Sequence, residues 1–104
     1  MGAWLPVMAT NQYYRGGNSI RPKPYEVRID PATGLLRTTH GVSVYDRPDN
    51  LNRFGGAYQV TAVPGELRIV QRGRDPHHFE IVPSKPMTLA EYEQALNQII
   101  LVPT

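Results

Sequence analysis

The sequence contains no cysteine. Disulfide bonds and thiolate-bound metals are therefore excluded, and the absence fits a cytoplasmic protein. No apolar run approaches the roughly 20 residues that a membrane-spanning helix requires. Residues 1–9 lack the basic start of a signal peptide and are interrupted by Pro6, which also stands where a myristoylation signal needs serine or threonine. We therefore expect neither a leader peptide nor a membrane contact.

Strong charge of either sign is also missing, because the formal net charge is only +2 and the sequence pI is about 9.2. This weak basic bias is typical of an ordinary solvated surface, and it is also compatible with an anionic ligand, an acidic partner or nucleic acid. No recognised nucleic-acid motif surrounds the arginines, and the aromatic residues are not interleaved with them along the chain. The arginines considered for such a patch are Arg47, Arg53, Arg68, Arg72 and Arg74.

Proline and glycine are frequent, with 10 and 9 of 104 residues. A chain of this length forms one domain, residues 1–104, and so many turn-forming residues favour short strands. Alternation of Tyr25, Val27 and Ile29 predicts a strand over residues 25–30 with these side chains inward. Other extended segments are expected at residues 4–9, 12–15, 57–63, 67–71 and 77–82, with 57–63 and 67–71 joined as a hairpin by Pro64 and Gly65.

Two helices are predicted. Asp46 suits an N-cap and Pro48 a first turn, so a short central helix of about two turns is expected to end at Phe54. Near the end of the chain, Thr88 and Glu91 form a capping-box pattern. Apolar residues then recur at helical spacing, which predicts an amphipathic helix over residues 89–100. The sequence therefore predicts a strand-rich α+β fold with one helix in the middle and one at the end.

Residues 38–48 predict a strand with two different faces. Val42 and Val44 alternate with Ser43 and Tyr45, so one face is apolar and the other polar. The same alternation recurs over residues 78–82, where the polar face carries His78 and Glu80 and the apolar face Phe79 and Ile81. Two strands of this kind suggest a cleft lined by a sheet.

The polar residues of these strands allow several kinds of chemistry. Ser43 lacks the Gly-x-Ser-x-Gly elbow of a hydrolase nucleophile, so it is either a hydrogen-bonding serine in a cleft or an ordinary half-exposed one. His78 and Glu80 share a face and suit acid/base work or the binding of sugar hydroxyls, although a surface pair fits equally. His77 and His78 point to opposite faces and no His-Glu-x-x-His pattern occurs, so no metal site is expected.

Arg15 ends an aromatic segment and precedes two glycines. Such an arginine can grip a phosphate or carboxylate with two hydrogen bonds, while the glycines let the ligand approach the backbone. Its spacing alone favours the alternative, an edge-strand arginine in water.

Three segments together resemble a known family. They are GVSVYDR at residues 41–47, LRIVQ at 67–71 and HFEIVPSKPM at 78–87. In order and rough spacing they are similar to the core of the NAD-dependent type VI secretion effector toxins of Pseudomonas, whose fold resembles ADP-ribosyltransferases. Residues 13–15, YYR, resemble the first strand of that family, whereas residues 16–39 show no convincing match. The resemblance covers about half of the chain.

The resemblance implies an α+β fold with a small split, curved antiparallel β-sheet of ADP-ribosyltransferase type, a short central helix and a C-terminal amphipathic helix. It implies NAD as substrate, without a metal. Arg15 would hold an NAD phosphate or ribose, and Ser43 would support the nicotinamide-ribose pocket. The other residues expected in that pocket are Tyr14, His40, Val42 and Tyr45.

In the family, a late residue, usually glutamate, contacts the ribose and stabilises its positive charge as nicotinamide leaves. This chain has no Glu-x-Glu pair, so the third catalytic position is open between His78, Gln71 and Glu80. We expect Arg15, Ser43 and His78 to converge on one ligand-sized hollow.

The resemblance also implies a biological role and a partner. The protein would be a toxin acting in the bacterial cytoplasm, delivered by secretion or held in a toxin–antitoxin pair, with a cognate immunity or antitoxin protein as partner. The ADP-ribose acceptor would be a protein, a nucleic acid, a small molecule or water. The alternatives are a non-catalytic toxin, an RNA- or DNA-binding protein of the same fold, and an adaptor that has lost the site.

Overall fold

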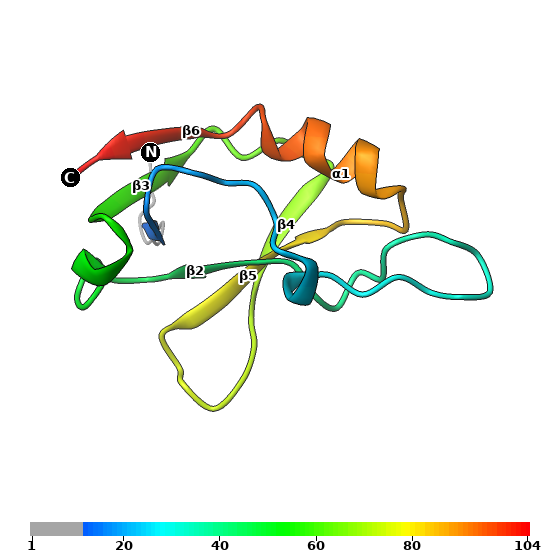
Figure 1. Cartoon of the computed structure of the whole chain (residues 1–104), viewed down its shortest axis with the longest axis horizontal. Helices are drawn as coiled ribbons and strands as arrows, with labels where there is room; N and C mark the ends of the chain where they lie inside the picture. Colours follow the sequence, from blue (N-terminus) through cyan, green and yellow to red (C-terminus); the bar gives the residue numbers. More distant parts are fainter. Residues whose placement is uncertain (1–11) are drawn as a thin grey trace, which may run out of the picture.

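A six-stranded antiparallel sheet and one α-helix form the part of the chain that the computed structural model describes, residues 12–104 (Figure 1). The α+β prediction is confirmed at this level. The strands are β1 (Tyr13–Gly16), β2 (Val42–Tyr45), β3 (Ala57–Thr61), β4 (Leu67–Gln71), β5 (His78–Pro83) and β6 (Ile100–Pro103). The helix α1 spans Leu89–Leu96, and two single 3-10 turns are η1 (Pro24–Glu26) and η2 (Asn52–Phe54).

The strand order is β4-β5-β2-β1-β3-β6, and the sheet has a seam in its middle. β1 and β2 pair only at Tyr14 and Tyr45, whereas each of the other neighbouring strands shares four or five paired positions. The sheet therefore consists of two halves, β4–β5–β2 and β1–β3–β6, that meet at a single pair.

α1 packs on one face of the sheet. Its buried Tyr92 and Leu96 belong to the same core cluster as Val42 and Ile81 of the strands. The Tyr92 hydroxyl accepts a hydrogen bond from the Val42 amide (3.0 Å) and donates one to the Ile81 carbonyl (2.5 Å), so it joins the helix to both β2 and β5. A Cβ on Gly41 would lie 1.8 Å from the Ile81 carbonyl oxygen, so only glycine fits before β2.

The other face of the sheet carries polar and aromatic side chains. Residues paired directly across antiparallel strands point to the same face. We call this face, which lies opposite the core that α1 covers, the open face; it includes Tyr14, Ser43, Tyr45, Gln59, His78 and Glu80. Since Val42 and Val44 are fully buried on the helix side, the predicted two-faced pattern of β2 is confirmed.

The predicted hairpin of residues 57–63 and 67–71 is wrong, although both strands exist. β3 pairs with β1 and β6, and β4 pairs with β5. Ala62 follows β3 with a φ of 60°, a left-handed conformation that redirects the chain before the turn at Pro64. The turn therefore joins two distant parts of the sheet.

The predicted strand over residues 25–30 is also wrong. Pro24 opens a 3-10 turn there, at the helix position where its fixed φ is compatible and its missing N–H is not needed. Tyr25 and Ile29 are 71% and 53% exposed, not inward. The buried residue of this segment is instead Glu26.

Both predicted helices are shorter than expected. The central one is only the three-residue turn η2, whose N-cap position is Leu51 with no side-chain cap bond. Asp46, the predicted cap, instead pairs with the His77 ring. α1 ends at Leu96, and Ile100, which we placed in the helix, begins β6 and is 59% exposed. Pairing of β6 with β3 outweighs the helical spacing of the apolar residues. The extended segment predicted for residues 4–9 lies outside the described residues.

Candidate functional site

The centre of the candidate site is a contact between β2 and β5. Ser43 pairs with Glu80 and Tyr45 with His78, so the polar faces predicted separately for the two strands form one continuous part of the open face. Ser43 Oγ lies 3.0 Å from His78 Nε2, and His78 Nδ1 lies 2.7 Å from the Arg72 carbonyl. A carbonyl only accepts, so Nδ1 donates to it. In the neutral imidazole, Nε2 is then an acceptor for the Ser43 hydroxyl.

Glu80 sits beside this pair but is already engaged. Its Oε1 accepts from the Gly41 amide at 3.0 Å, and its Oε2 accepts from Arg72 Nε at 3.1 Å. The same Oε2 lies 3.9 Å from His78 Nε2, so a proton gained by the imidazole would face a negative charge. Glu80 is thus placed to stabilise a protonated His78 and less well placed to touch a ligand directly, because it is 7% exposed.

Arg15 and Glu26 form a buried ion pair in the seam between the half-sheets. Arg15 Nη1 donates to Glu26 Oε2 (3.0 Å) and to the Ser43 carbonyl (2.8 Å), and its Nε donates to the Ser19 carbonyl (3.1 Å). The Ser43 amide donates to the same Glu26 oxygen at 3.0 Å. β1 and β2 pair only at Tyr14 and Tyr45, so β1 offers no strand partner to Ser43. The Arg15 and Glu26 side chains instead bond its backbone carbonyl and amide.

Neither expectation for Arg15 describes this arrangement. The side chain is not an exposed edge-strand arginine, because β1 lies between β2 and β3 and Arg15 is 6% exposed. It is not free to grip an anion either, since the Nε and both Nη1 hydrogens have partners and Nη2 lies 3.5 Å from Glu26 Oε1. Glu26 itself was missed, because a lone glutamate between Tyr25 and Val27 gives no sequence signal of burial.

The electrostatics of Glu26 follow from two opposing effects. Burial pushes the pKa of its carboxyl up, but the hydrogen bond from Arg15, the amides of Lys23 and Ser43 and the arginine charge outweigh burial. The pKa is therefore held below its ordinary value of 4.5. The carboxylate is charged at neutral pH and the pair is intact.

The remaining predicted residues divide into two groups. Tyr14 lies opposite Tyr45 on the open face. His40 lies just before β2, where burial, followed by repulsion from Arg72 and Arg28, lowers the pKa of its ring. Val42 and Gln71 do not reach the open face: Val42 is buried under α1, and Gln71 lies opposite Phe79 and holds the β4–β5 loop through its amide.

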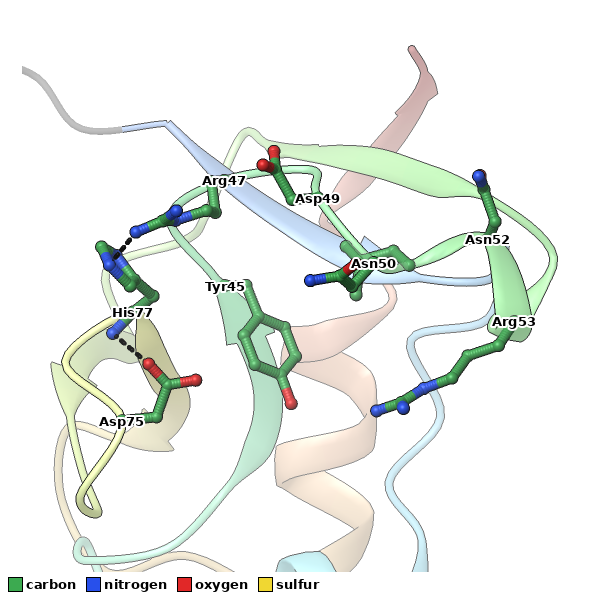
Figure 2. Close-up of a pocket in the computed structure, with 9 residues that line it drawn as sticks. Tyr45, Arg47, Asp49, Asn50, Asn52, Arg53, Asp75 and His77 are labelled. Atoms are coloured by element: carbon green, nitrogen blue, oxygen red, sulfur yellow. Dashed lines mark hydrogen bonds between the residues drawn. The ribbon is translucent and has the colours of Figure 1, made fainter.

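A separate hollow of about 620 Å³ lies beside Tyr45, where no sequence argument placed one (Figure 2). Figure 2 shows the Tyr45 ring between the Asp75–His77 side of the hollow and the Arg53 side. The His77 ring joins Asp46 through Nδ1 (2.9 Å) and contacts Arg47 through Nε2. The lining residues are Tyr45, Arg47, Asp49, Asn50, Leu51, Asn52, Arg53, Asp75 and His77.

Arg15, Ser43 and His78 are linked by hydrogen bonds, but they do not line a common cavity, so the predicted shared hollow is not found in the described part of the chain. Arg15 reaches the Ser43 carbonyl and His78 the Ser43 hydroxyl. Neither the Tyr45 hollow nor the hollow of about 430 Å³ beside Arg15 is lined by Ser43 or His78. A ligand that touches the Ser43–His78 pair would therefore lie on the open face of the sheet.

Within residues 12–104, no three histidine, aspartate or glutamate side chains converge as a ligand set for a metal ion. In the same part of the chain, no helix has the length and apolar character needed to cross a bilayer. Fold and site define a small α+β domain with a polar and aromatic open sheet face. Comparisons with protein-family models, curated proteins and solved structures found no match for this chain.

Proposed function

We propose that this protein is a bacterial toxin of ADP-ribosyltransferase type that consumes NAD, by transfer of ADP-ribose to an acceptor or by hydrolysis. The observation that carries the proposal is the 3.0 Å contact between Ser43 Oγ and His78 Nε2 beside the seam of the sheet. Two residues that are 35 positions apart in the sequence, and that the sequence analysis names as site candidates, meet there. The seam itself, a single pair between two half-sheets, supports the split-sheet type.

The chemistry needs little acid help, because nicotinamide leaves the ribose as a neutral ring. The bond from C1′ to the nicotinamide nitrogen breaks, and its electron pair neutralises the pyridinium. The acceptor oxygen then bonds to C1′, and its proton passes through the Ser43 hydroxyl to His78 Nε2. Glu80, 3.9 Å from Nε2, stabilises the imidazolium.

This scheme assigns roles to the three candidates for the third position. His78 is the base, since its Nε2 faces the Ser43 hydroxyl while its Nδ1 bonds the Arg72 carbonyl. Glu80 acts through His78, because both of its oxygens are already bonded. Gln71 takes no part, because it lies on the helix side of the sheet. Arg15 is a positioning residue that holds the backbone of Ser43.

The toxin would act in the bacterial cytoplasm, where NAD is abundant, and a cognate immunity protein would protect the producing cell. The test is nicotinamide release from NAD by the purified protein, alone and with bacterial lysate as a source of acceptors. Ser43→Ala and His78→Asn are expected to lower the rate by at least about 100-fold, the lower range for a positioned proton acceptor. Ser84→Ala is the matched control, because that serine bonds only the Glu66 carbonyl at a distant turn.

Glu80→Gln is expected to lower the rate less than His78→Asn, and Gln71→Ala to leave it within about twofold. No nicotinamide release by the wild-type protein with or without lysate contradicts the proposal. Full activity in both Ser43→Ala and His78→Asn contradicts the site.

A further inference from the structure

The open face carries a row of rings that the sequence does not reveal. Gln59 of β3 pairs with Tyr14 of β1, Tyr14 with Tyr45 of β2, and Tyr45 with His78 of β5. Directly opposite residues have Cβ atoms about 5 Å apart, so three rings lie side by side on three adjacent strands. The Tyr45 and His78 rings meet edge to face with centroids 5.4 Å apart.

These rings are not needed for the core. The buried apolar cluster lies on the α1 side and includes Val42, Val44 and Ile81, whereas Tyr14, Tyr45 and His78 are each half-buried on the other side. A row of partly exposed aromatic rings on one face of an antiparallel sheet is the arrangement on which sheet-type RNA-binding modules stack unpaired bases.

Two cationic side chains lie on either side of the row, toward opposite ends of the strands. Arg68 of β4 faces the same side as Val82, four residues along β5 from His78, and is exposed. Beyond Tyr45, Arg53 borders the hollow, and its guanidinium lies on the far side from His77 in Figure 2. Phosphates of a strand that crosses the sheet would meet a positive charge on either side.

The acidic groups of this region are mostly engaged. Glu80 is paired with Arg72, Asp46 with His77, and the Asp75 carboxylate accepts from the His77 amide at 2.9 Å. Asp49, which also lines the hollow, is the acid of this region with no such bond described. The local charge therefore favours a polyanion across the rings and arginines.

We propose that the open face binds single-stranded nucleic acid, with bases stacked on Tyr14 and Tyr45 and phosphates held by Arg53 and Arg68. The hollow beside Tyr45, about 620 Å³, is large enough for one nucleotide, and Asn50 and Asn52 offer amides to a base edge. The proposal does not rest on NAD chemistry. If both hold, the bound strand is a candidate acceptor.

The test measures fluorescence anisotropy of labelled 12-nucleotide oligouridylate and oligoadenylate without NAD, with a duplex of the same length as comparison. Tyr14→Leu and Tyr45→Leu are each expected to weaken binding by at least about fivefold, the low end for one stacked base. Tyr25→Leu is the matched control, because Tyr25 is 71% exposed on η1 and lies outside the row.

Salt dependence tests the phosphate contacts. Arg68→Gln is expected to reduce the slope of log affinity against log salt by about 0.7, the value for one phosphate of a single strand. Arg21→Gln is the control, because Arg21 lies in a hollow with Glu93 and Leu96 on the α1 side. A second measurement needs no variant: NMR shifts of the Tyr14, Tyr45 and His78 rings should change with the oligonucleotide, and those of Tyr25 should not.

Three results would overturn the proposal. They are no binding of either oligonucleotide at 50 mM salt, tighter binding of the duplex than of the single strands, and binding that both tyrosine variants retain in full while they stay folded. The last result would indicate a general polyanion or acidic-protein surface without base stacking. Since NAD is absent, a negative result here leaves the nicotinamide assay untouched, and the reverse also holds.

Discussion

Removal of the Glu26 charge is expected to destabilise the protein by about 3–5 kcal/mol, the range for breaking a buried ion pair by loss of one partner. In Glu26→Gln the side chain keeps its size and one acceptor oxygen, but the Arg15 guanidinium, 6% exposed, would lose its counter-charge. Because one kcal/mol corresponds to about 4–8 °C for a domain of about this size, Tm should fall by at least about 12 °C.

The assay is chemical unfolding by urea at pH 7, followed by circular dichroism, with Glu66→Gln as the matched control. Glu66 is exposed, so its variant is expected to stay within about 0.5 kcal/mol of the wild type. Arg15→Met combined with Glu26→Gln removes both charges, and the double variant should be less destabilised than the sum of the single variants. A cost below about 1 kcal/mol for Glu26→Gln would refute the reasoning that the pair closes the seam.

The same pair gives the protein a defined pH dependence. The folded-state pKa of Glu26 lies below the ordinary value of 4.5, so its contribution to stability is present above pH 4.5 and is lost as the pH falls through the folded-state value. Glu26→Gln should therefore flatten the acid side of the stability profile as well as lower its plateau.

Three further predictions concern the residues around the site. Tyr92→Phe removes the hydroxyl that joins the Val42 amide to the Ile81 carbonyl, and should lower the free energy of unfolding by about 1–3 kcal/mol in urea titrations. Gly41→Ala places a Cβ 1.8 Å from the Ile81 carbonyl oxygen and should lower the free energy of unfolding by about 3 kcal/mol in the same assay. A loss under about 1 kcal/mol would contradict this close approach. His40 should titrate below 6.5 by NMR, and Arg72→Gln should raise its midpoint only in part, since burial is the larger cause; an unchanged midpoint in that variant would contradict the assigned repulsion.

Features set by neighbours in the sequence could be predicted. Alternation placed Ser43 and Tyr45 opposite Val42 and Val44, because successive strand residues point to opposite faces. The capping box was equally local: Thr88 Oγ1 accepts from the Glu91 amide at 3.1 Å, and the Glu91 carboxylate accepts from the Thr88 amide at 2.9 Å. Each of these patterns carries its own geometric rule.

Features set by strand partners could not be predicted. The turn at Pro64 and Gly65 was recognised, but which strands pair depends on burial elsewhere in the sheet, so the hairpin was wrong. The phase of β4 against β5 puts Gln71 opposite Phe79, on the helix side, and no local pattern fixes that phase. The row of rings could not be predicted for the same reason, because Tyr14 and Tyr45 become neighbours only through the pairing of β1 with β2.

Ser43 takes part both in the ion-pair network of the seam and in the proposed catalytic contact with His78, and this changes how an Arg15 variant should be interpreted. Its backbone belongs to the Arg15–Glu26 network and its hydroxyl to His78. Loss of nicotinamide release in Arg15→Ala would therefore not by itself show that Arg15 binds NAD. If Arg15 positions Ser43, the variant should lower kcat and the free energy of unfolding together, and Glu26→Gln should lower both in the same direction. If Arg15 instead held an NAD phosphate, KM should rise in Arg15→Ala while Glu26→Gln, which frees the guanidinium, would lower KM. Opposite shifts of KM in the two variants would therefore contradict the positioning role.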